Sequence, residues 1–356
     1  MDISLLARLS NADSIASNED EVRNIIREEL AAYSDSFAYD GIGSLLLTRK
    51  SRQKDAPTIL FAAHMDEVGF MVRHISEIGF LYLMPIGGVL DKAKENQLVR
   101  VTTDSGDKFE GVLNVTKTPQ GQVIDSYVDL GLETDVEVEA AGIRIGDMVT
   151  FASTFRALGK PSACANAAPA DVYAGKAMDD RASCFTLIEA MKELADQDLA
   201  VNVVAAFTSS EEVGTRGGRL SASLVKPDIF FAVDVANNPE LDRSFTNHRK
   251  IGHGPMLEYY DKGLAPNRRL IRHIEKVLAE NELPYQKDMF KNGGTDAGMA
   301  HLENSGLLAA VLGLPLRYCH SPYSIVNLKD AQVMKTLIVE ISKSFSAENI
   351  SELYHY

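Results

Sequence analysis

Apolar residues recur along the chain with two spacings, one typical of helices and the other of strands. Residues 19–33 carry an amphipathic pattern at helical spacing, so we expect a helix there. Ser17 and Asp20 stand where a capping box would begin this helix. Residues 44–47 and 58–63 are predicted strands, and the second, Thr-Ile-Leu-Phe-Ala-Ala, is apolar almost without interruption. Such a run is typical of a strand that is covered on both faces of a sheet.

The pattern changes between residues 69 and 160. Short stretches that suit strands alternate there with Gly, Asp and Asn turn signals. The predicted strands span 80–84, 98–102, 108–115 and 148–151, with a short helix at 133–140. This succession indicates a small antiparallel β domain, such as a barrel.

After this region the alternation of helices and strands returns. Helices are predicted at 181–196, 267–281, 295–303 and 329–345, and strands at 201–207, 229–233 and 307–312. Alternating elements of this kind indicate an α/β fold with a mainly parallel sheet sandwiched by helices. We therefore predict an α/β domain made of residues 1–68 and 161–356, with the β domain of residues 69–160 inserted into it.

The composition excludes several classes of protein. The chain has 356 residues, of which 45% are hydrophobic, and no apolar run approaches the roughly 20 residues that span a bilayer. A net charge of -14 repels nucleic acid and anionic membrane surfaces, so neither is expected as a partner. Residues 1–11 lack the features of a secretion signal, and Cys164, Cys184 and Cys319 have no paired spacing. We therefore expect a cytoplasmic protein.

Five short segments, far apart in the sequence, place a metal-binding side chain beside a hydrophobic run. They are Ala-Ala-His64-Met-Asp66, Ala-Met-Asp179-Asp180, Ser-Ser-Glu211-Glu212, Ala-Val-Asp234 and Tyr-Cys-His320. Most of these side chains come at or soon after the end of a predicted strand, and in an open parallel sheet those ends gather at one edge, where ligands bind. Taken singly, each segment would suit an ordinary surface. Together, their imidazoles and carboxylates indicate a hydrolytic site for zinc, cobalt or manganese.

The metal ligands can be assigned by their chemistry. Two ions about 3.5–4 Å apart need a bridging carboxylate and terminal ligands on each side. We assign Asp179 as the bridge, His64 and Asp234 to one ion, and Glu212 and His320 to the other.

This assignment leaves Glu211 without an ion. Adjacent residues of an extended chain point to opposite sides, so Glu211 and Glu212 are not expected to bind the same ion. Glu211 is therefore the candidate general base, acting on a water whose pKa a metal lowers to about 7. Asp66, two residues after His64, is expected to hold the second nitrogen of that imidazole. Cys319, beside His320, is expected to pack inward.

With these residues the chain resembles the tetrahedral (TET) aminopeptidases, a family that includes the glutamyl and deblocking aminopeptidases. The resemblance covers essentially the whole chain. It is most specific at His-Met-Asp-Glu-Val-Gly (64–69), Glu-Glu-Val-Gly-x-Arg-Gly (211–217), Gly-Gly-Thr-Asp-Ala-Gly (293–298) and Arg-Tyr-x-His-Ser (317–321). The family's metal ligands fall on the five residues assigned above, and its catalytic base falls on Glu211.

The resemblance implies a cytosolic metallo-aminopeptidase that removes N-terminal residues from short peptides. It implies two divalent ions per subunit, zinc before cobalt or manganese, and a cis peptide bond after Asp179. His64 and Asp179 are 115 positions apart, which leaves room for a whole inserted domain. In the family this domain mediates dimers, and dimers commonly assemble into a hollow twelve-subunit tetrahedron. A homo-oligomer of this kind is therefore expected here.

Three other functions remain to be weighed against this one. A deacylase or dipeptidase of the related dinuclear group would act on N-acylated amino acids or depend on a substrate carboxylate. A non-catalytic scaffold that used metals only for folding would not need the spare carboxylate of Glu211. A glycosidase with paired carboxylates would need no such imidazoles. The sequence names neither the preferred N-terminal residue nor the roles of His248 and His253, which follow Asp234 in a polar loop.

Overall fold

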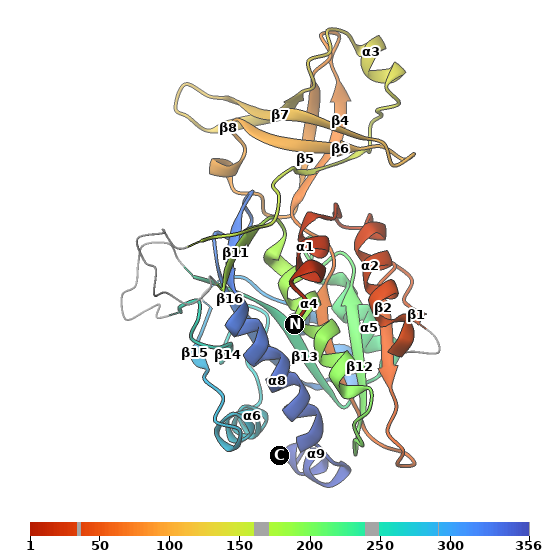
Figure 1. Cartoon of the computed structure of the whole chain (residues 1–356), viewed down its shortest axis with the longest axis vertical. Coiled ribbons are helices and arrows are strands. Elements are labelled where there is room, and N and C mark those ends of the chain that lie inside the picture. Colours follow the sequence, from red (N-terminus) through yellow and green to blue (C-terminus); the bar gives the residue numbers. More distant parts are fainter. Residues whose placement is uncertain (34–36, 160–170, 239–248, 291, 356) are drawn as a thin grey trace.

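The computed structural model describes residues 1–33, 37–159, 171–238, 249–290 and 292–355. These residues form a layered α/β unit and a barrel that stands on one end of it (Figure 1). Both chain ends lie in the α/β unit, and the barrel is formed by a stretch from the first half of the sequence. None of the described helices is long and apolar enough to cross a membrane.

The α/β unit is built on one sheet of 11 strands. Its central strands β12, β3, β13 and β16 run parallel in this order, whereas the strands on both flanks pair antiparallel. The bounds are β1 (Ala38–Tyr39), β2 (Leu45–Arg49), β3 (Thr58–His64), β10 (Arg156–Ala157), β11 (Val172–Gly175), β12 (Asn202–Thr208), β13 (Ile229–Asn238), β14 (Met256–Glu258), β15 (Gln286–Asp288), β16 (Leu308–Arg317) and β17 (Ser324–Asn327). The predicted α/β class is confirmed, and its parallel part is the centre of the sheet together with the short parallel pair β14 and β15.

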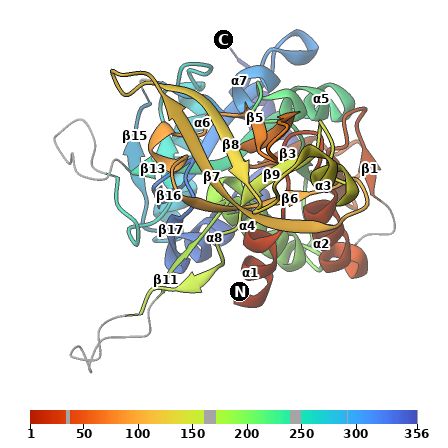
Figure 2. The ribbon, with the colours of Figure 1, turned by 90° about the horizontal axis from the view of Figure 1, so that it is seen from above.

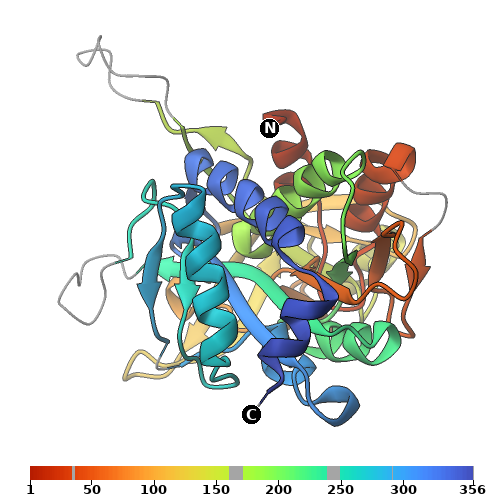
Figure 3. The ribbon, with the colours of Figure 1, turned by 90° about the horizontal axis from the view of Figure 1, so that it is seen from below.

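Helices cover both faces of this sheet. The bounds are α1 (Ile3–Asn11), α2 (Asp20–Leu30), α4 (Met178–Leu194), α5 (Arg216–Val225), α6 (Arg268–Glu280), α7 (Asp296–Ala300), α8 (Leu328–Ser344) and α9 (Ala347–Leu353), with 3-10 turns at Ala31–Tyr33 and Glu303–Ser305. A large apolar cluster packs α1, α2, α4, α6, α8 and α9 on one face, and a smaller cluster packs α5 and α7 on the other. Figure 2 shows these two sides from above, and Figure 3 shows α6 and α8 side by side from below.

The central strand β3 is buried on both faces, as its apolar run predicted. Every residue of β3 after Thr58 is buried. On one face the Phe61 ring stacks on that of Phe231 in β13, with 4.8 Å between the ring centroids. Paired aromatic rings of this kind add to the stability that burial alone provides. The strand that ends in His64 is thus held rigidly from both sides.

The barrel is closed by six antiparallel strands in the order β4, β5, β8, β7, β6 and β9. The bounds are β4 (Gly69–Ile75), β5 (Leu81–Ile86), β6 (Gln97–Thr102), β7 (Lys108–Lys117), β8 (Val123–Asp129) and β9 (Met148–Phe151), with a 3-10 turn at Asp91–Ala93 and helix α3 at Asp135–Ala140. Its own apolar core contains Phe70 and Phe151, whose rings meet edge to face at 6.1 Å. The predicted small antiparallel unit is confirmed. The boundaries at 68/69 and 160/161 stay predictions, and the second lies outside the described residues.

A buried carboxylate joins the two units. Asp13, in the segment after α1, is fully buried and lies 2.8 Å from both Arg100 and Lys108 of the barrel. Its other oxygen accepts a hydrogen bond of 2.7 Å from Thr150 of β9 and lies 3.1 Å from Lys176 of the α/β unit. One acidic side chain therefore links three barrel strands to the sheet below.

One predicted cap is wrong. Ser17 does not cap α2, because Glu19 is the N-cap residue and no side chain caps the helix. The Ser17 main-chain N–H donates to the Glu19 carboxylate at 2.8 Å, and the Ser17 hydroxyl lies 3.4 Å from that of Ser210. The Ser17 hydroxyl is thus directed toward the loop after β12 and not toward the helix end.

Candidate active site

The candidate residues come together at the carboxyl edge of the central strands. His64 is the last residue of β3, and Asp234 lies in the second half of β13. Residues 211–212 follow β12, and His320 follows β16, each within a few positions. Asp179 lies at the start of α4, where its backbone is not yet helical. All five elements belong to, or lead directly out of, the same sheet.

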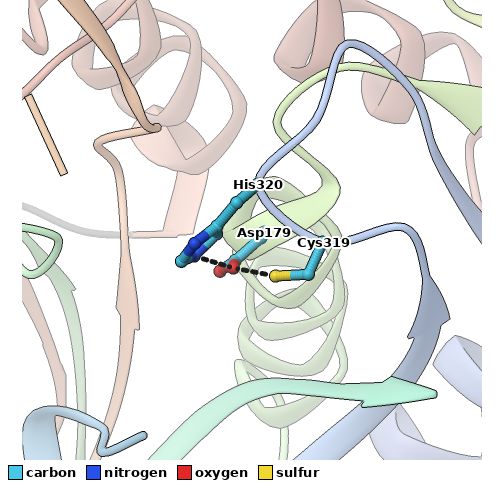
Figure 4. A group of neighbouring side chains, drawn as sticks. All are labelled: Asp179, Cys319 and His320. Carbon is cyan, nitrogen blue, oxygen red and sulfur yellow. Dashed lines mark hydrogen bonds and ion pairs between the residues drawn. The ribbon is translucent and has the colours of Figure 1, made fainter. Parts of the chain in front are cut away.

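Asp179 lies between the two imidazoles. Its Oδ1 atom is 3.1 Å from Nε2 of His64, and its Oδ2 atom is 3.2 Å from Nε2 of His320. The same Oδ2 atom accepts a hydrogen bond of 2.7 Å from the Cys319 thiol (Figure 4). The peptide bond from Asp179 to Asp180 is cis, as the resemblance implied. Each oxygen of this carboxylate therefore faces a different imidazole, which is what a carboxylate bridging two ions requires.

Three overlapping groups of side chains have donor atoms within 4.8 Å of one another. They are His64 with Asp180 and Asp234, His64 with Asp179 and Glu212, and Asp179 with Cys319 and His320. All five predicted ligands belong to at least one group. Two further members of these groups were not predicted as ligands: Asp180, and Cys319, which packs against the apolar core as expected and also contacts Asp179.

The donor atoms suit divalent cations. Oε1 of Glu212 is buried and makes no hydrogen bond to any described residue, although it lies 3.3 Å from Nε2 of His320. Oδ1 of Asp180 is buried without a described partner in the same way. Beside Asp179, Glu212 and His320 lies a cavity of ≈ 10 Å³, about the room of one water or ion. Because buried polar atoms without partners are costly, these residues fit metal ions.

The electrostatics of the site lead to the same conclusion. Burial raises the pKa of Glu211 and of Glu212, and it raises the pKa of Asp234 to about 7. Burial also opposes ionisation of Asp179, but the imidazoles of His320 and His64 hold its pKa well below the usual range. The site thus gathers more carboxylates than imidazoles. Divalent cations would relieve the repulsion among them.

Asp66 fixes the loop that carries both glutamates. Its Oδ1 atom accepts the main-chain N–H of Glu211 at 3.0 Å, and its Oδ2 atom accepts that of Glu212 at 3.1 Å. The imidazole of His64 is held by Asp66 in a different manner from the one expected. Nδ1 of His64 is 2.9 Å from the main-chain oxygen of Asp66, whereas the carboxylate is 3.6 Å away.

Asp296 supports the same loop from α7. Its carboxylate accepts hydrogen bonds from the Thr208 hydroxyl at 2.5 Å and from the Gly218 main-chain N–H at 3.0 Å. A Cβ atom at position 218 would overlap the Asp296 side chain, so this close approach requires glycine. The end of β12 and the start of α5, which flank residues 211–212, are therefore tied to one buried acid.

The remaining histidines of interest have other surroundings. His301 bonds within its own helical segment, with Nδ1 3.0 Å from the main-chain oxygen of Ala297. His253 is exposed, and His248 lies outside the described residues, as does Cys164. Cys184 is a buried free thiol.

Known proteins resemble this chain over nearly its full length. The profile of the M42 glutamyl aminopeptidase family matches residues 43–337. The putative aminopeptidase FrvX of Escherichia coli (strain K12) is 31% identical over 99% of this chain and 98% of that protein. The TET aminopeptidase of the marine sediment archaeon Thaumarchaeota archaeon SCGC AB-539-E09 superposes with a TM-score of 0.91 at 30% identity, covering 99% of both chains.

A second solved structure adds information on assembly. The TET1 peptidase of Pyrococcus horikoshii, which can assemble into a tetrahedron or a large octahedral shell, superposes with a TM-score of 0.84 at 27% identity over 96% of this chain and 99% of that one. The motifs, the fold and these comparisons agree. The chain therefore belongs to the M42 glutamyl aminopeptidase family and is a peptide hydrolase.

Proposed function

We propose that this protein is a dinuclear metal-dependent aminopeptidase that hydrolyses the N-terminal residue of short peptides. The observation that carries the proposal is the position of Asp179, whose two oxygens lie 3.1 Å from His64 and 3.2 Å from His320. A single carboxylate between two imidazoles, with further carboxylates on each side, supports a pair of ions rather than one.

In this proposal Asp179 would be a ligand of both ions. His64 and Asp234 would hold one of them, and Glu212 and His320 would hold the other. Zinc is the proposed metal, with cobalt and manganese as alternatives, because the donors are nitrogen and oxygen atoms. When bound, the ions polarise the scissile carbonyl and make the attacking water more acidic.

Glu211 is the proposed general base. Its side chain is buried beside the ligands, and burial raises its pKa toward the range in which a carboxylate can both accept and return a proton. As the water oxygen bonds to the carbonyl carbon, Glu211 takes the proton that this water loses. It then gives the proton to the nitrogen of the departing amine as the C–N bond breaks. The hydrogen bonds of Asp66 to the main chain hold this glutamate in place.

The barrel is the proposed dimer interface. Leu98 of β6 and Val112 of β7 face each other across the strands and are 58% and 42% exposed. Exposed apolar side chains that adjoin in this way are typical of interaction surfaces. We further propose that dimers assemble into a tetrahedral dodecamer in the cytoplasm. Light scattering on the purified protein tests the proposed assembly. A monomer mass at every protein concentration measured would contradict it.

The catalytic proposal is tested with paired substrates. Metal-stripped protein is refilled with zinc, cobalt or manganese and assayed on aminoacyl chromogenic amides and on the same amides with an acetylated amine. We expect hydrolysis of the free-amine series and at most traces with the acetylated series. The opposite preference would favour a deacylase, and a requirement for a substrate carboxylate would favour a dipeptidase.

A further inference from the structure

Glu258, the last residue of β14, is a buried carboxylate without a partner. Glu258 is 1% exposed, and neither of its carboxylate oxygens has a hydrogen-bond donor among the described residues. Asp261 lies three residues later, is also 1% exposed, and accepts the main-chain N–H groups of Gly263 and Leu264 with one oxygen. Its second oxygen has no described partner. Carboxylates buried in this way are unstable as anions unless a cation joins them.

Among the described residues, Arg249 is the cation that acts on Glu258, and it also engages other groups. The Nε atom of Arg249 is 3.2 Å from Asp288, and its guanidinium lies over the ring of Phe290 at 4.5 Å from the centroid. Burial, then repulsion from Asp261 and Asp234, raises the pKa of Glu258 to about 9, and Arg249 offsets this only in part. The group of Glu258, Asp261 and Asp288 thus has more acids than Arg249 can neutralise.

The sheet register connects Glu258 with the proposed metal site. Asp234 of β13 and Met256 of β14 are both paired with Gly313 of β16, which lies between them. Residues in one row of a sheet share a face, and Glu258, two positions after Met256, points to the same face. Two inter-strand spacings put the backbones of β13 and β14 about 10 Å apart. Gly313 has no side chain of its own, and the side chains of Ala236 and Met256 lie over it.

We propose that Glu258 and Asp261 bind the cationic side chain of the substrate's N-terminal residue, so that this enzyme prefers N-terminal lysine or arginine. The inference rests on the proposed aminopeptidase function. An amine held beside Asp234 would direct a long side chain along this face of the sheet, past Ala236 and Met256, toward Glu258. A lysine ammonium or arginine guanidinium is long enough to cover that distance and carries the charge that the acids lack. A glutamate side chain would instead add a further buried carboxylate, so N-terminal glutamate should be a poor substrate.

The experiment compares aminomethylcoumarin amides of Lys, Arg, Leu and Glu on zinc-loaded wild-type protein and on Glu258→Gln and Asp261→Asn. Glutamine has the shape of the protonated acid, so the fold should tolerate Glu258→Gln. Because a hydrogen bond to a charged group contributes about 1.5–3 kcal/mol, we expect the ratio of kcat/KM for Lys over Leu to fall about 10- to 100-fold in that variant. The rate of each variant on the Leu substrate is the internal reference for this ratio. Glu280→Gln, at an exposed position of α6, is the matched control and should keep the wild-type ratio.

A binding measurement separates charge recognition from catalysis. L-Lysine and L-norleucine have nearly the same carbon skeleton and differ in the ammonium group. Competitive inhibition by L-lysine should be stronger than by L-norleucine in the wild type and equal to it in Glu258→Gln.

The failures are distinguishable. The specificity inference would be wrong if the wild type hydrolysed Leu and Glu amides with the same kcat/KM as Lys amides. It would also be wrong if Glu258→Gln kept the Lys-to-Leu ratio of kcat/KM. In both cases the proposed aminopeptidase function would stand. If Glu258→Gln instead lost a third bound ion and thermal stability with an unchanged ratio, the acids would hold a structural cation and the inference would again be wrong. Hydrolysis of none of the amides after metal loading would overturn both proposals.

Discussion

The Oδ1 atom of Asp66 accepts a hydrogen bond of 3.0 Å from the main-chain N–H of Glu211, although 145 positions separate the two residues. Its other oxygen bonds the next N–H in the chain. Asp66 therefore holds the main chain of the proposed base and of its neighbour Glu212. Its effect on turnover should be positional.

Replacing Asp66 by asparagine tests this positional role. An amide retains one oxygen acceptor but presents an NH2 group where the second acceptor was, so one of the two loop hydrogen bonds is lost. We expect kcat to fall about tenfold or more, in line with the loss of one hydrogen bond to a charged group, with little change in bound metal. Steady-state kinetics and elemental analysis measure the two quantities. Asp196→Asn, at an exposed position, should behave as wild type.

Replacing Glu211 by glutamine removes the proposed base and leaves its shape. Loss of general-base catalysis should lower kcat by about 10²- to 10⁴-fold. The metal content should stay near that of the wild type, because Glu211 is not assigned to either ion. Elemental analysis of the same sample used for kinetics checks both. Retention of wild-type turnover would falsify the assigned mechanism, and Glu139→Gln on the exposed side of α3 is the control.

The proposed bridging role of Asp179 predicts a difference between two variants of the candidate metal site. Asp179→Asn should lose both ions, because each oxygen of this carboxylate faces a different imidazole. His320→Ala should lose mainly the ion that it shares with Glu212 and keep the other. Elemental analysis after dialysis against a weak chelator distinguishes the two results. Equal metal loss in both variants would show that the two positions do not fill independently.

Asp13 predicts a pH-dependent stability. Burial opposes its ionisation, but Lys176, Arg100 and Lys108 prevail and hold its pKa well below the usual range. The folded pKa thus lies below the unfolded value of about 3.9, so the charged form stabilises the fold above that pH and its contribution fades as the pH falls below it. Asp13→Asn should cost about 1.5–3 kcal/mol at pH 7, because it removes the charged acceptor that three cations share, although Lys176 keeps Glu67 and Lys108 keeps Glu21.

Urea unfolding at a series of pH values measures this contribution. The difference between wild type and Asp13→Asn should be constant from pH 7 to about pH 5 and should shrink below about pH 4. Asp104→Asn, an exposed barrel position, should show no such difference. If the difference in the free energy of unfolding between wild type and Asp13→Asn grew toward acid pH, the sign of the pKa shift of Asp13 would be wrong.

Local patterns predicted most of the site, and tertiary contacts determined what they missed. His64 and Asp234 could be found because each terminates or lies near the end of an apolar strand, a local signal. Helix α5 was not predicted, because Gly217 and Gly218 weaken its helical propensity and are needed for close packing. Glu258 was missed too. A strand of three residues is too short to show an alternation of polar and apolar positions. The Glu258 carboxylate becomes buried only when β14 pairs with β16 in the folded protein.

The place of β3 in the sheet also governs how the chain must fold as it is synthesised. β3 ends at His64, but its neighbours β12 and β13 begin only at Asn202 and Ile229. A nascent chain leaving the ribosome therefore exposes an apolar segment with no strand to pair with, whereas the barrel, contained within residues 69–151, can close while translation continues. The catalytic half assembles last, and the unpaired segment is where chaperones would be needed and where truncated products would aggregate.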